Sequence, residues 1–238
     1  MLADIHGNAA ALEAVLGEVE ADAIVVAGDV VSGPFPALTI DLLLALPGAR
    51  FVRGNADRAV VEAFDAGRRF DPGETNPAHM ASWDAQRITR EQREFLAAFA
   101  PTIEVEPGFL VCHGTPRSDE EIVTSLTPDH VLRDVLQHAQ ARLVVGGHTH
   151  VQYERTLDGT KIVNAGSVGM PYEGRPGAYW LLVDGDDVQH RRTEYDVERV
   201  AEAIRASDYW DAEKLARTLL KPPSGAEAEA FFEQAAGR

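Results

Sequence analysis

Five short apolar segments of this chain are each followed by a glycine-flanked polar residue of a type that binds metal ions. The segments cover residues 1–3, 23–27, 49–52, 109–112 and 143–145. The polar residues that follow them, in order, are Asp4 and His6, Asp29, Asn55, His113, and His148 and His150. In a parallel α/β sheet the carboxyl ends of the strands face one crevice, so these side chains are expected to converge on a single site.

The pattern between these segments predicts an α/β fold. Residues 10–20 and 38–46 have apolar residues at helical spacing, and they alternate with the strand-like segments 23–27 and 49–52. This order is typical of βαβ units with a mainly parallel sheet. From 151 to 194, short strands broken by Asp-Gly pairs predict antiparallel hairpins. Helices are expected at 128–140, 198–205 and 211–219, with a tail after Pro223 that is either a further helix or frayed.

The length of 238 residues predicts a single domain over 1–238, with a small helical insert at about 65–99 that is expected to lie on its surface. Residues 65–77 are rich in Gly, Pro, Arg and Asp, and 78–98 form a weakly amphipathic helical stretch. The arginines of this insert form either one wall of a substrate cleft or a solvated face. They are Arg68, Arg69, Arg87, Arg90 and Arg93.

Charge and cysteine content narrow the class of protein. The chain has 22 Lys and Arg against 38 Asp and Glu, a net charge of −16, which disfavours extended nucleic-acid or anionic-membrane binding. Its one cysteine, Cys112, excludes an internal disulfide and favours the cytoplasm. Apolar runs such as 42–46 fall far short of the ~20 residues that span a bilayer, and no secretory signal is visible. We expect a cytoplasmic protein.

Taken singly, each polar residue has an ordinary structural explanation. An Asp after a strand is most often a turn or helix-cap residue, and a lone His is usually a structural polar group, as we expect for His79, His130, His138 and His190. The set of seven is different, because it combines oxygen and imidazole donors without a thiolate. That is too many ligands for one tetrahedral ion but suits two ions that share a bridging carboxylate. Such a pair, with two aspartates and a hydroxide, leaves a charge of about +1, which attracts a phosphoryl group.

The same residues resemble a known family. Asp4-x-His6, Gly28-Asp29, Gly54-Asn55, His113 and Gly147-His148-x-His150 are similar, in that order, to the five-block signature of the calcineurin-like metallophosphoesterases. Residues 164–169 resemble a later segment of the small bacterial and archaeal phosphodiesterase branch. The resemblance implies a four-layer α/β/β/α sandwich. It also implies one ion bound by Asp4, His6, Asp29 and His150, and a second bound by Asn55, His113, His148 and the bridging Asp29.

One departure from the family bears on function. Many members carry a His after the Gly-Asn block, and here that position is Ala56. The resemblance therefore favours a phosphodiesterase in which metal-bound hydroxide attacks a small phosphoester. The alternatives are a phosphomonoesterase, a dinucleoside-polyphosphate hydrolase, or a non-catalytic scaffold of the same fold. The ligand set favours two divalent ions, with manganese expected and iron, nickel, cobalt or zinc as alternatives.

Three further expectations concern the surroundings of the ligands. Asn8 and Arg53 flank ligand turns and are predicted to contact the substrate phosphate, against the alternatives of a turn hydrogen bond and a surface salt bridge. Asp57 is expected to cap the following helix or to support a ligand. Only three residues precede Asp4, so either the chain starts further upstream or the first strand is short.

Overall fold

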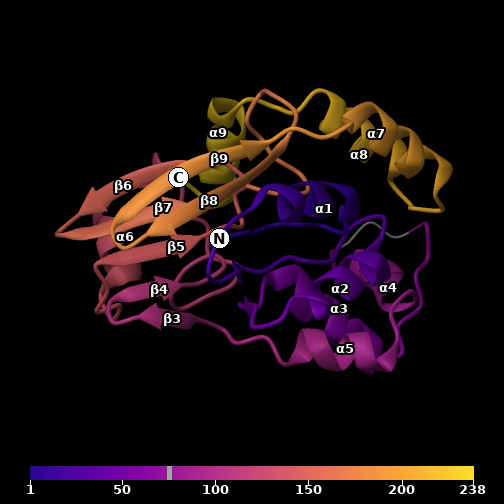
Figure 1. The fold of residues 1–238 in the computed structure, drawn as a ribbon, viewed down its shortest axis with the longest axis horizontal. Coiled ribbons are helices and arrows are strands. Elements are labelled where there is room, and N and C mark those ends of the chain that lie inside the picture. The colour runs from indigo at the N-terminus through magenta and orange to yellow at the C-terminus, as the bar shows by residue number, and fades with distance from the viewer. Residues whose placement is uncertain (74–76) are drawn as a thin grey trace.

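The computed structural model describes residues 1–73 and 77–238. Over these ranges, a pair of β-sheets lie face to face with helices outside them (Figure 1). The side chain of His79 and residues 74–76 of the predicted insert lie outside the described residues. No helix among the described residues has the length and apolar character needed to cross a membrane.

The first sheet is built around the amino-terminal residues. β1 (Val25–Val26) pairs in parallel with β2 (Arg50–Phe51), and β8 (Ala178–Asp184) pairs antiparallel with β9 (Asp187–Thr193). Residues 1–3 join the two pairs, because Leu2 N donates to Val25 O on one side and Leu181 N donates to Met1 O on the other. Residues 1–3 therefore lie where the first strand was predicted, with a parallel bridge between Leu2 and Val26.

The second sheet has five strands in the order β3-β4-β5-β7-β6. β4 (Phe109–Val111), β5 (Leu143–Gly146) and β7 (Thr160–Asn164) are parallel, whereas β3 (Ile103–Glu106) and β6 (Tyr153–Leu157) are antiparallel to their neighbours. The β6–β7 hairpin turns at Asp158-Gly159, where both residues have positive φ, as a tight two-residue turn requires.

Alternation along the strands of the first sheet places core residues on both of its faces. Ala3, Val25 and Ala27 face the second sheet, where they pack with Val111 and Val145. Leu2 and Val26 point the other way, toward helices of the first half of the chain. These helices are α1 (Ala9–Glu18), α2 (Pro36–Leu44), α3 (Asn55–Asp65), α4 (Pro77–Ala85) and α5 (Arg90–Ala97).

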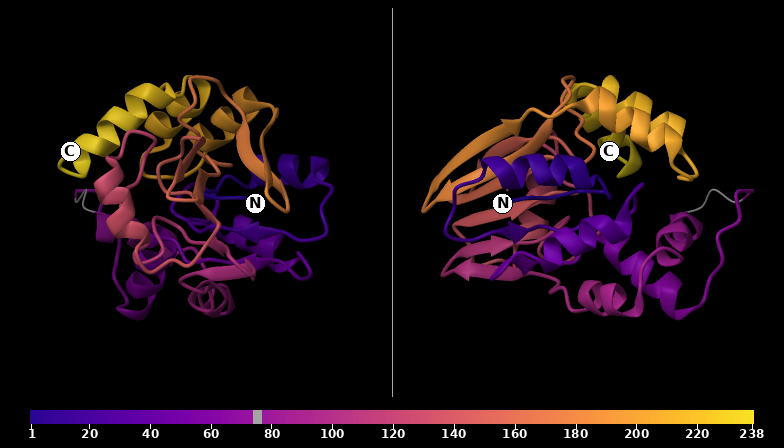
Figure 2. Two further views of the ribbon diagram at one scale, coloured as in Figure 1. Left: turned by 90° about the vertical axis from the view of Figure 1, so that its left-hand side faces the viewer. Right: turned by 45° about the vertical axis from the view of Figure 1, so that its right-hand side comes forward.

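Helix α6 (Asp129–Leu136) covers the outer face of the second sheet, where Leu132 and Val135 pack on Leu157 and Ile162. The predicted four layers are thus present (Figure 2). Near the amino end of α1 lie α7 (Val197–Ala206) and α8 (Ala212–Leu220), whose buried residues pack with Ala10 and Phe35. The tail after Pro223 forms α9 (Gly225–Ala235).

The sequence predicted one helical stretch over 78–98, whereas the structure has two helices there, α4 and α5. The first, α4, ends at Ala85, and Thr89 caps α5, because its hydroxyl accepts from Gln92 N while the Gln92 side chain accepts from Thr89 N. This capping box is legible in the sequence as Thr-x-x-Gln. The segment also contributes Ile88, Leu96 and Phe99 to the main core, so it is packed into the domain rather than laid on its surface.

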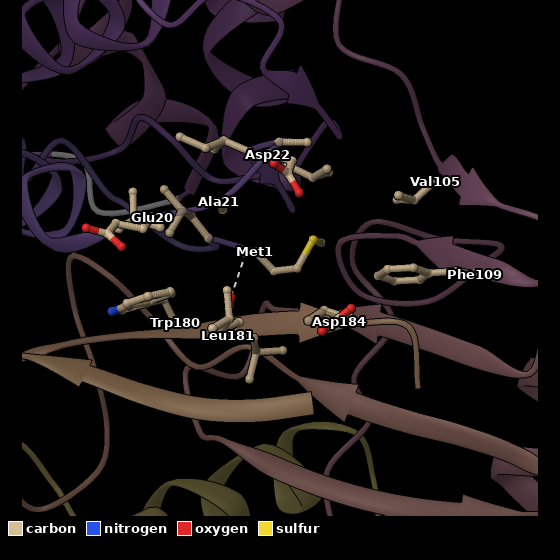
Figure 3. Close-up of a pocket in the computed structure, with 16 residues that line it drawn as sticks. Met1, Glu20, Ala21, Asp22, Val105, Phe109, Trp180, Leu181 and Asp184 are labelled. Atoms are coloured by element: carbon tan, nitrogen blue, oxygen red, sulfur yellow. Dashed lines mark hydrogen bonds between the residues drawn. The ribbon is translucent and has the colours of Figure 1, made fainter. Parts of the chain in front are cut away.

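A cavity of about 420 Å³ lies between the sheets at the edge where the parallel strands begin (Figure 3). Met1 and Leu181, joined by a backbone hydrogen bond of 2.8 Å, line it together with Phe109 and Trp180. The predicted ligands all follow strand ends, at the opposite edge. This cavity therefore takes no part in the site described next.

Candidate metal centre

The seven predicted ligands come together at the carboxyl ends of the strands. Two groups of side chains have donor atoms close enough to hold one ion each: Asp4 with His6 and His150, and Asp29 with His113 and His148. Asn55, the seventh, lies beside the second group, with its Oδ1 3.1 Å from His113 Nε2. Residues from 4 to 150 meet here because each terminates a strand or opens a helix at the same edge of the sandwich.

The donor atoms in the first group are spaced as ligands of one ion would be. His150 Nε2 lies 3.2 Å from Asp4 Oδ1 and 3.0 Å from His6 Nε2. Metal–ligand bonds of about 2.0–2.2 Å place neighbouring ligand atoms roughly 3 Å apart. Asp4 Oδ1 is buried and, among the described residues, has no hydrogen-bond partner, as expected of an oxygen that binds a cation.

Asp29 lies between the two groups. Its Oδ2 is 3.4 Å from His113 Nε2 in the second group and 3.8 Å from His6 Nε2 in the first. The other carboxylate oxygen, Oδ1, accepts a 2.8 Å hydrogen bond from the backbone of Ala56 in the first turn of α3. A bridging carboxylate needs this position, with one oxygen directed at both sites.

In three of the histidines, a hydrogen bond from one ring nitrogen to a backbone carbonyl determines which nitrogen is left to bind an ion. His113 Nδ1 donates to Ala27 O and His150 Nδ1 donates to Met170 O, each at 2.7 Å, so Nε2 is the nitrogen that each offers to an ion. His148 is anchored the other way, with Nε2 donating to Glu120 O at 3.2 Å, which leaves Nδ1 for an ion. Such outer contacts are typical of metal-binding histidines.

The backbone at the ligands is strained. Five of them have positive φ: Asp4 (53°), His6 (47°), Asp29 (52°), His148 (71°) and His150 (59°). A non-glycine residue in this region costs of the order of 1–3 kcal/mol and persists only where the surroundings enforce it. Strain concentrated on ligand positions supports a functional role for this edge, and nothing in the sequence predicted it.

Glycines beside the ligands permit close approach. A Cβ at Gly54 would lie 2.0 Å from Asp29 Oδ1, and one at Gly147 would lie 2.4 Å from Asp4 Oδ2. Both contacts are too short for any other residue. The glycines that flank the ligands in the sequence are therefore required by the approach of the two aspartates.

Two buried aspartates support the loop that carries Asp29. Asp57 accepts from the backbone N–H groups of Asp29, Val30 and Gly54, at 2.9, 2.9 and 3.0 Å. Asp57 therefore holds the loop that carries Asp29 and also caps α3. These two roles were expected as alternatives, and the structure shows both. Burial, reinforced by the charge of Asp29, raises the pKa of Asp57 to about 7.

The second supporting aspartate, Asp84 of α4, was not predicted. Its Oδ1 accepts from Ser32 N and Gly33 N at 3.0 and 3.2 Å. Burial raises the pKa of Asp84 to about 7. Through this residue the predicted insert helps to shape the ligand loop.

The electrostatics of the site favour a bound cation. Burial by itself raises the pKa of Asp4, but His150 and His113 outweigh it and lower that pKa. Burial likewise opposes the imidazolium of His113, yet Asp29 and Asp4 raise its pKa to about 10. Without an ion, the proton on His113 offsets part of the charge of the two aspartates, and metal binding would release it. The residues present therefore fit two divalent ions.

The structure places the two predicted substrate contacts differently. Asn8 caps α1 by accepting from Ala11 N, and its amide donates to Gly169 O and Tyr195 Oη, so the turn hydrogen bond is present and phosphate contact stays a prediction. Arg53 lies with its Nε 3.6 Å from Asp119 and is 38% exposed, close enough to the ligand turn to remain a candidate.

Sequence reasoning missed the roles of three residues around the ligands. Asn164 donates to Gly147 O and Thr149 Oγ1, and the Ser167 hydroxyl donates to Asp4 O. Tyr172 stacks on His150 with ring centroids 4.8 Å apart. Asn164 and Ser167 lie in the segment that resembled the family, which was the available signal; Tyr172 had none.

A sandwich with paired Asp/His clusters at one edge defines a metallophosphoesterase fold, and the comparisons with known proteins agree. The model of the calcineurin-like phosphoesterase superfamily domain matches residues 1–187. The chain therefore belongs to the calcineurin-like phosphoesterase superfamily.

Individual relatives cover nearly the whole chain. An uncharacterized protein of Methanocaldococcus jannaschii is 27% identical over 230 residues, which are 86% of this chain and 90% of that protein. The structure of a metallophosphoesterase from Sphaerobacter thermophilus is 25% identical with a TM-score of 0.72, over 90% of this chain and 97% of that one. A hypothetical protein from Pyrococcus horikoshii has a TM-score of 0.73 at 18% identity, over 92% and 95% of the two chains, and shows the fold.

Proposed function

We propose that this protein hydrolyses phosphodiesters with two divalent metal ions, manganese being the expected metal. The observation that carries the proposal is the position of Asp29, whose Oδ2 lies 3.4 and 3.8 Å from histidines of two separate ligand groups. Two ions at such a site supply a water nucleophile at neutral pH and neutralise charge on the phosphoryl group. We also propose that the protein acts in the cytoplasm and that its substrate is a small phosphoester.

Charge supports a diester over a monoester. A monoester carries more negative charge than a diester and needs additional cations. Arg53 and Arg58 both lie beside Asp119, at 3.6 and 2.9 Å, and Lys214 lies 3.6 Å from Asp211. Each is already beside a carboxylate, so a substrate with a single negative charge fits this surrounding better.

Position 56 determines how the leaving group departs. Ala56 offers only its backbone N–H, which is engaged by Asp29, so no imidazole at this position can protonate the departing oxygen. Without such help, the rate should depend steeply on the acidity of the leaving group. A series of aryl diesters measured as kcat/KM tests this, and a flat dependence with chemistry rate-limiting would contradict it.

The decisive experiment compares bis-p-nitrophenyl phosphate with p-nitrophenyl phosphate in the presence of Mn²⁺. We expect kcat/KM to be higher for the diester than for the monoester. The Asp29→Asn variant should hydrolyse neither substrate. A higher value on the monoester would support the phosphomonoesterase alternative. Bound metal without turnover of any phosphoester, including dinucleoside polyphosphates, would instead favour a non-catalytic scaffold.

A further inference from the structure

A second cavity, of about 240 Å³, opens beside the first ligand group. His6 lines it together with Ser32, which follows the ligand Asp29, and Met170, whose carbonyl oxygen accepts from His150. The other lining residues come from segments further away in the sequence. Met80 comes from α4, Tyr172 from the loop after β7, and Tyr209 and Trp210 from the turn between α7 and α8. A group in this cavity would therefore lie next to a phosphate held at the ions.

We propose that this cavity binds a nucleobase carried by one ester arm of the substrate, with Trp210 and Tyr209 as specificity-determining residues. The inference rests on the proposed phosphoester hydrolysis and goes beyond it by naming the substrate class. Tyr209 and Trp210 also lie beyond residues 1–187 that the family model matches, so this part of the wall is outside the matched region.

The lining favours a flat aromatic group. Three aromatic side chains, Tyr172, Tyr209 and Trp210, face the cavity together with the thioethers of Met80 and Met170. Aromatic rings provide stacking surfaces for bases, and methionine adapts to irregular shapes and makes favourable contacts with rings. Tyr209 is held in place by an edge-on contact with the buried Trp83, with ring centroids 5.0 Å apart.

The size and charge of the cavity favour one neutral ring system. Sites that enclose a whole drug-sized ligand measure about 300–1,000 Å³, so a cavity of about 240 Å³ accommodates a portion of a substrate. Its one acidic and one basic lining residue, Asp211 and Lys214, lie 3.6 Å apart and offset each other. A charged arm would gain little here.

Polar atoms distinguish a base from a simple aryl group. Among the residues that the structure describes, the hydroxyls of Tyr172 and Tyr209 make no hydrogen bond, although both side chains line the cavity. A nucleobase presents donors and acceptors at its edge that can pair with such hydroxyls, whereas a phenyl ring presents none. A phenyl ring would leave these hydroxyls without a partner, so the cavity should bind a nucleobase in preference to a phenyl ring.

The test uses three diesters that share the p-nitrophenolate leaving group and differ in the other arm: thymidine 5′-yl, phenyl and methyl. With Mn²⁺ we expect kcat/KM for the thymidine ester to exceed that for the methyl ester by about tenfold to a hundredfold, the range for one base–aromatic stack. Trp210→Leu should reduce this ratio to within about threefold, and Trp210→Phe should restore most of it. Phe231→Ala removes an exposed aromatic (65%) outside the cavity and should leave the ratio unchanged.

Each remaining outcome decides the proposal. Equal rates with the thymidine and phenyl esters would overturn the nucleobase assignment, and equal rates with all three would overturn the cavity's role altogether. If none is hydrolysed, the proposed function fails, and calorimetric binding decides this inference separately. Thymidine 5′-monophosphate should then bind at least tenfold more tightly than ribose 5-phosphate, in a manner lost in Trp210→Leu; equal binding would overturn the inference.

Discussion

The Nε2 atoms of His6 and His150 lie 3.0 Å apart in the buried centre of the site. Because His150 Nδ1 donates to Met170 O, its Nε2 is an acceptor. Unless His6 supplies a proton, two lone pairs face each other, which is unfavourable. A divalent cation placed near both nitrogens and Asp4 would replace this repulsion with attraction, so the arrangement supports a metal site at this position.

The first prediction concerns metal content. His150→Ala should lower the bound manganese from about two ions per chain to about one, because the first group loses a ligand while Asp29, His113 and His148 keep theirs. Inductively coupled plasma mass spectrometry after dialysis measures this. His138→Ala, an exposed histidine after α6, is the matched control and should retain both ions. Two ions in the His150 variant would show that the groups are not separate sites.

The second prediction concerns Asp57. Asp57→Asn places an amide NH₂ opposite backbone N–H donors of the loop that carries Asp29. We expect metal affinity to fall by roughly 10–100-fold, as for other residues that orient ligands, measured by calorimetric titration. Asp196→Asn alters a comparable cap, on Arg199 N of α7, and should change stability by no more than about 1 kcal/mol without changing metal affinity. If neither variant changes the metal affinity, Asp57 acts only as a helix cap and does not support the ligands.

The third prediction concerns pH. Burial raises the pKa of Asp84 to about 7, above about 3.9 in an unfolded chain. Between these values the folded state binds more protons, so this residue's contribution to stability falls as pH rises from about 4 to 7 and is lowest above that. Asp84→Asn keeps an oxygen for Ser32 and Gly33 without the charge. The free energy of unfolding of this variant, minus that of the unmodified chain, should therefore increase as the pH rises. The full increase should be about 1.4 kcal/mol for each unit by which folding raises the pKa of Asp84.

Urea denaturation at pH 5 and pH 8 measures that difference. A difference that stays constant between the two pH values would mean that Asp84 titrates normally. Metal-free protein should be used throughout, because metal binding changes with pH in its own right.

The fourth prediction concerns close packing at Gly169. A Cβ there would lie 1.7 Å from the carbonyl oxygen of Ile5, in the backbone between Asp4 and His6. Gly169→Ala should destabilise the protein by about 3 kcal/mol or more and weaken metal binding by displacing both ligands. Gly17→Ala, in α1 with open space around it, should instead stabilise by about 0.5–1 kcal/mol. Chemical denaturation compares the two, and similar effects would refute the steric argument.

Several features were accessible from the sequence because they depend on local patterns. The apolar segments before Asp29, His113 and His148 are strands, and the metal-type residues follow them as predicted. The break between α4 and α5 was missed although the capping box at Thr89 encodes it. The expected surface character of residues 65–99 was only partly correct, since Ile88 and Leu96 are buried.

The amino-acid sequence by itself determined which residues are the candidate metal ligands and at which edge of the fold they gather, because strand ends and glycine positions are set by local chemistry. Only the tertiary structure decided how they are presented: the left-handed backbone at Asp29, the carbonyl that orients His150, and the aromatic wall supplied by Trp210. These depend on contacts between segments more than a hundred residues apart in some cases, such as His6 and Trp210 around one cavity. No local pattern specifies which distant side chain will lie opposite another.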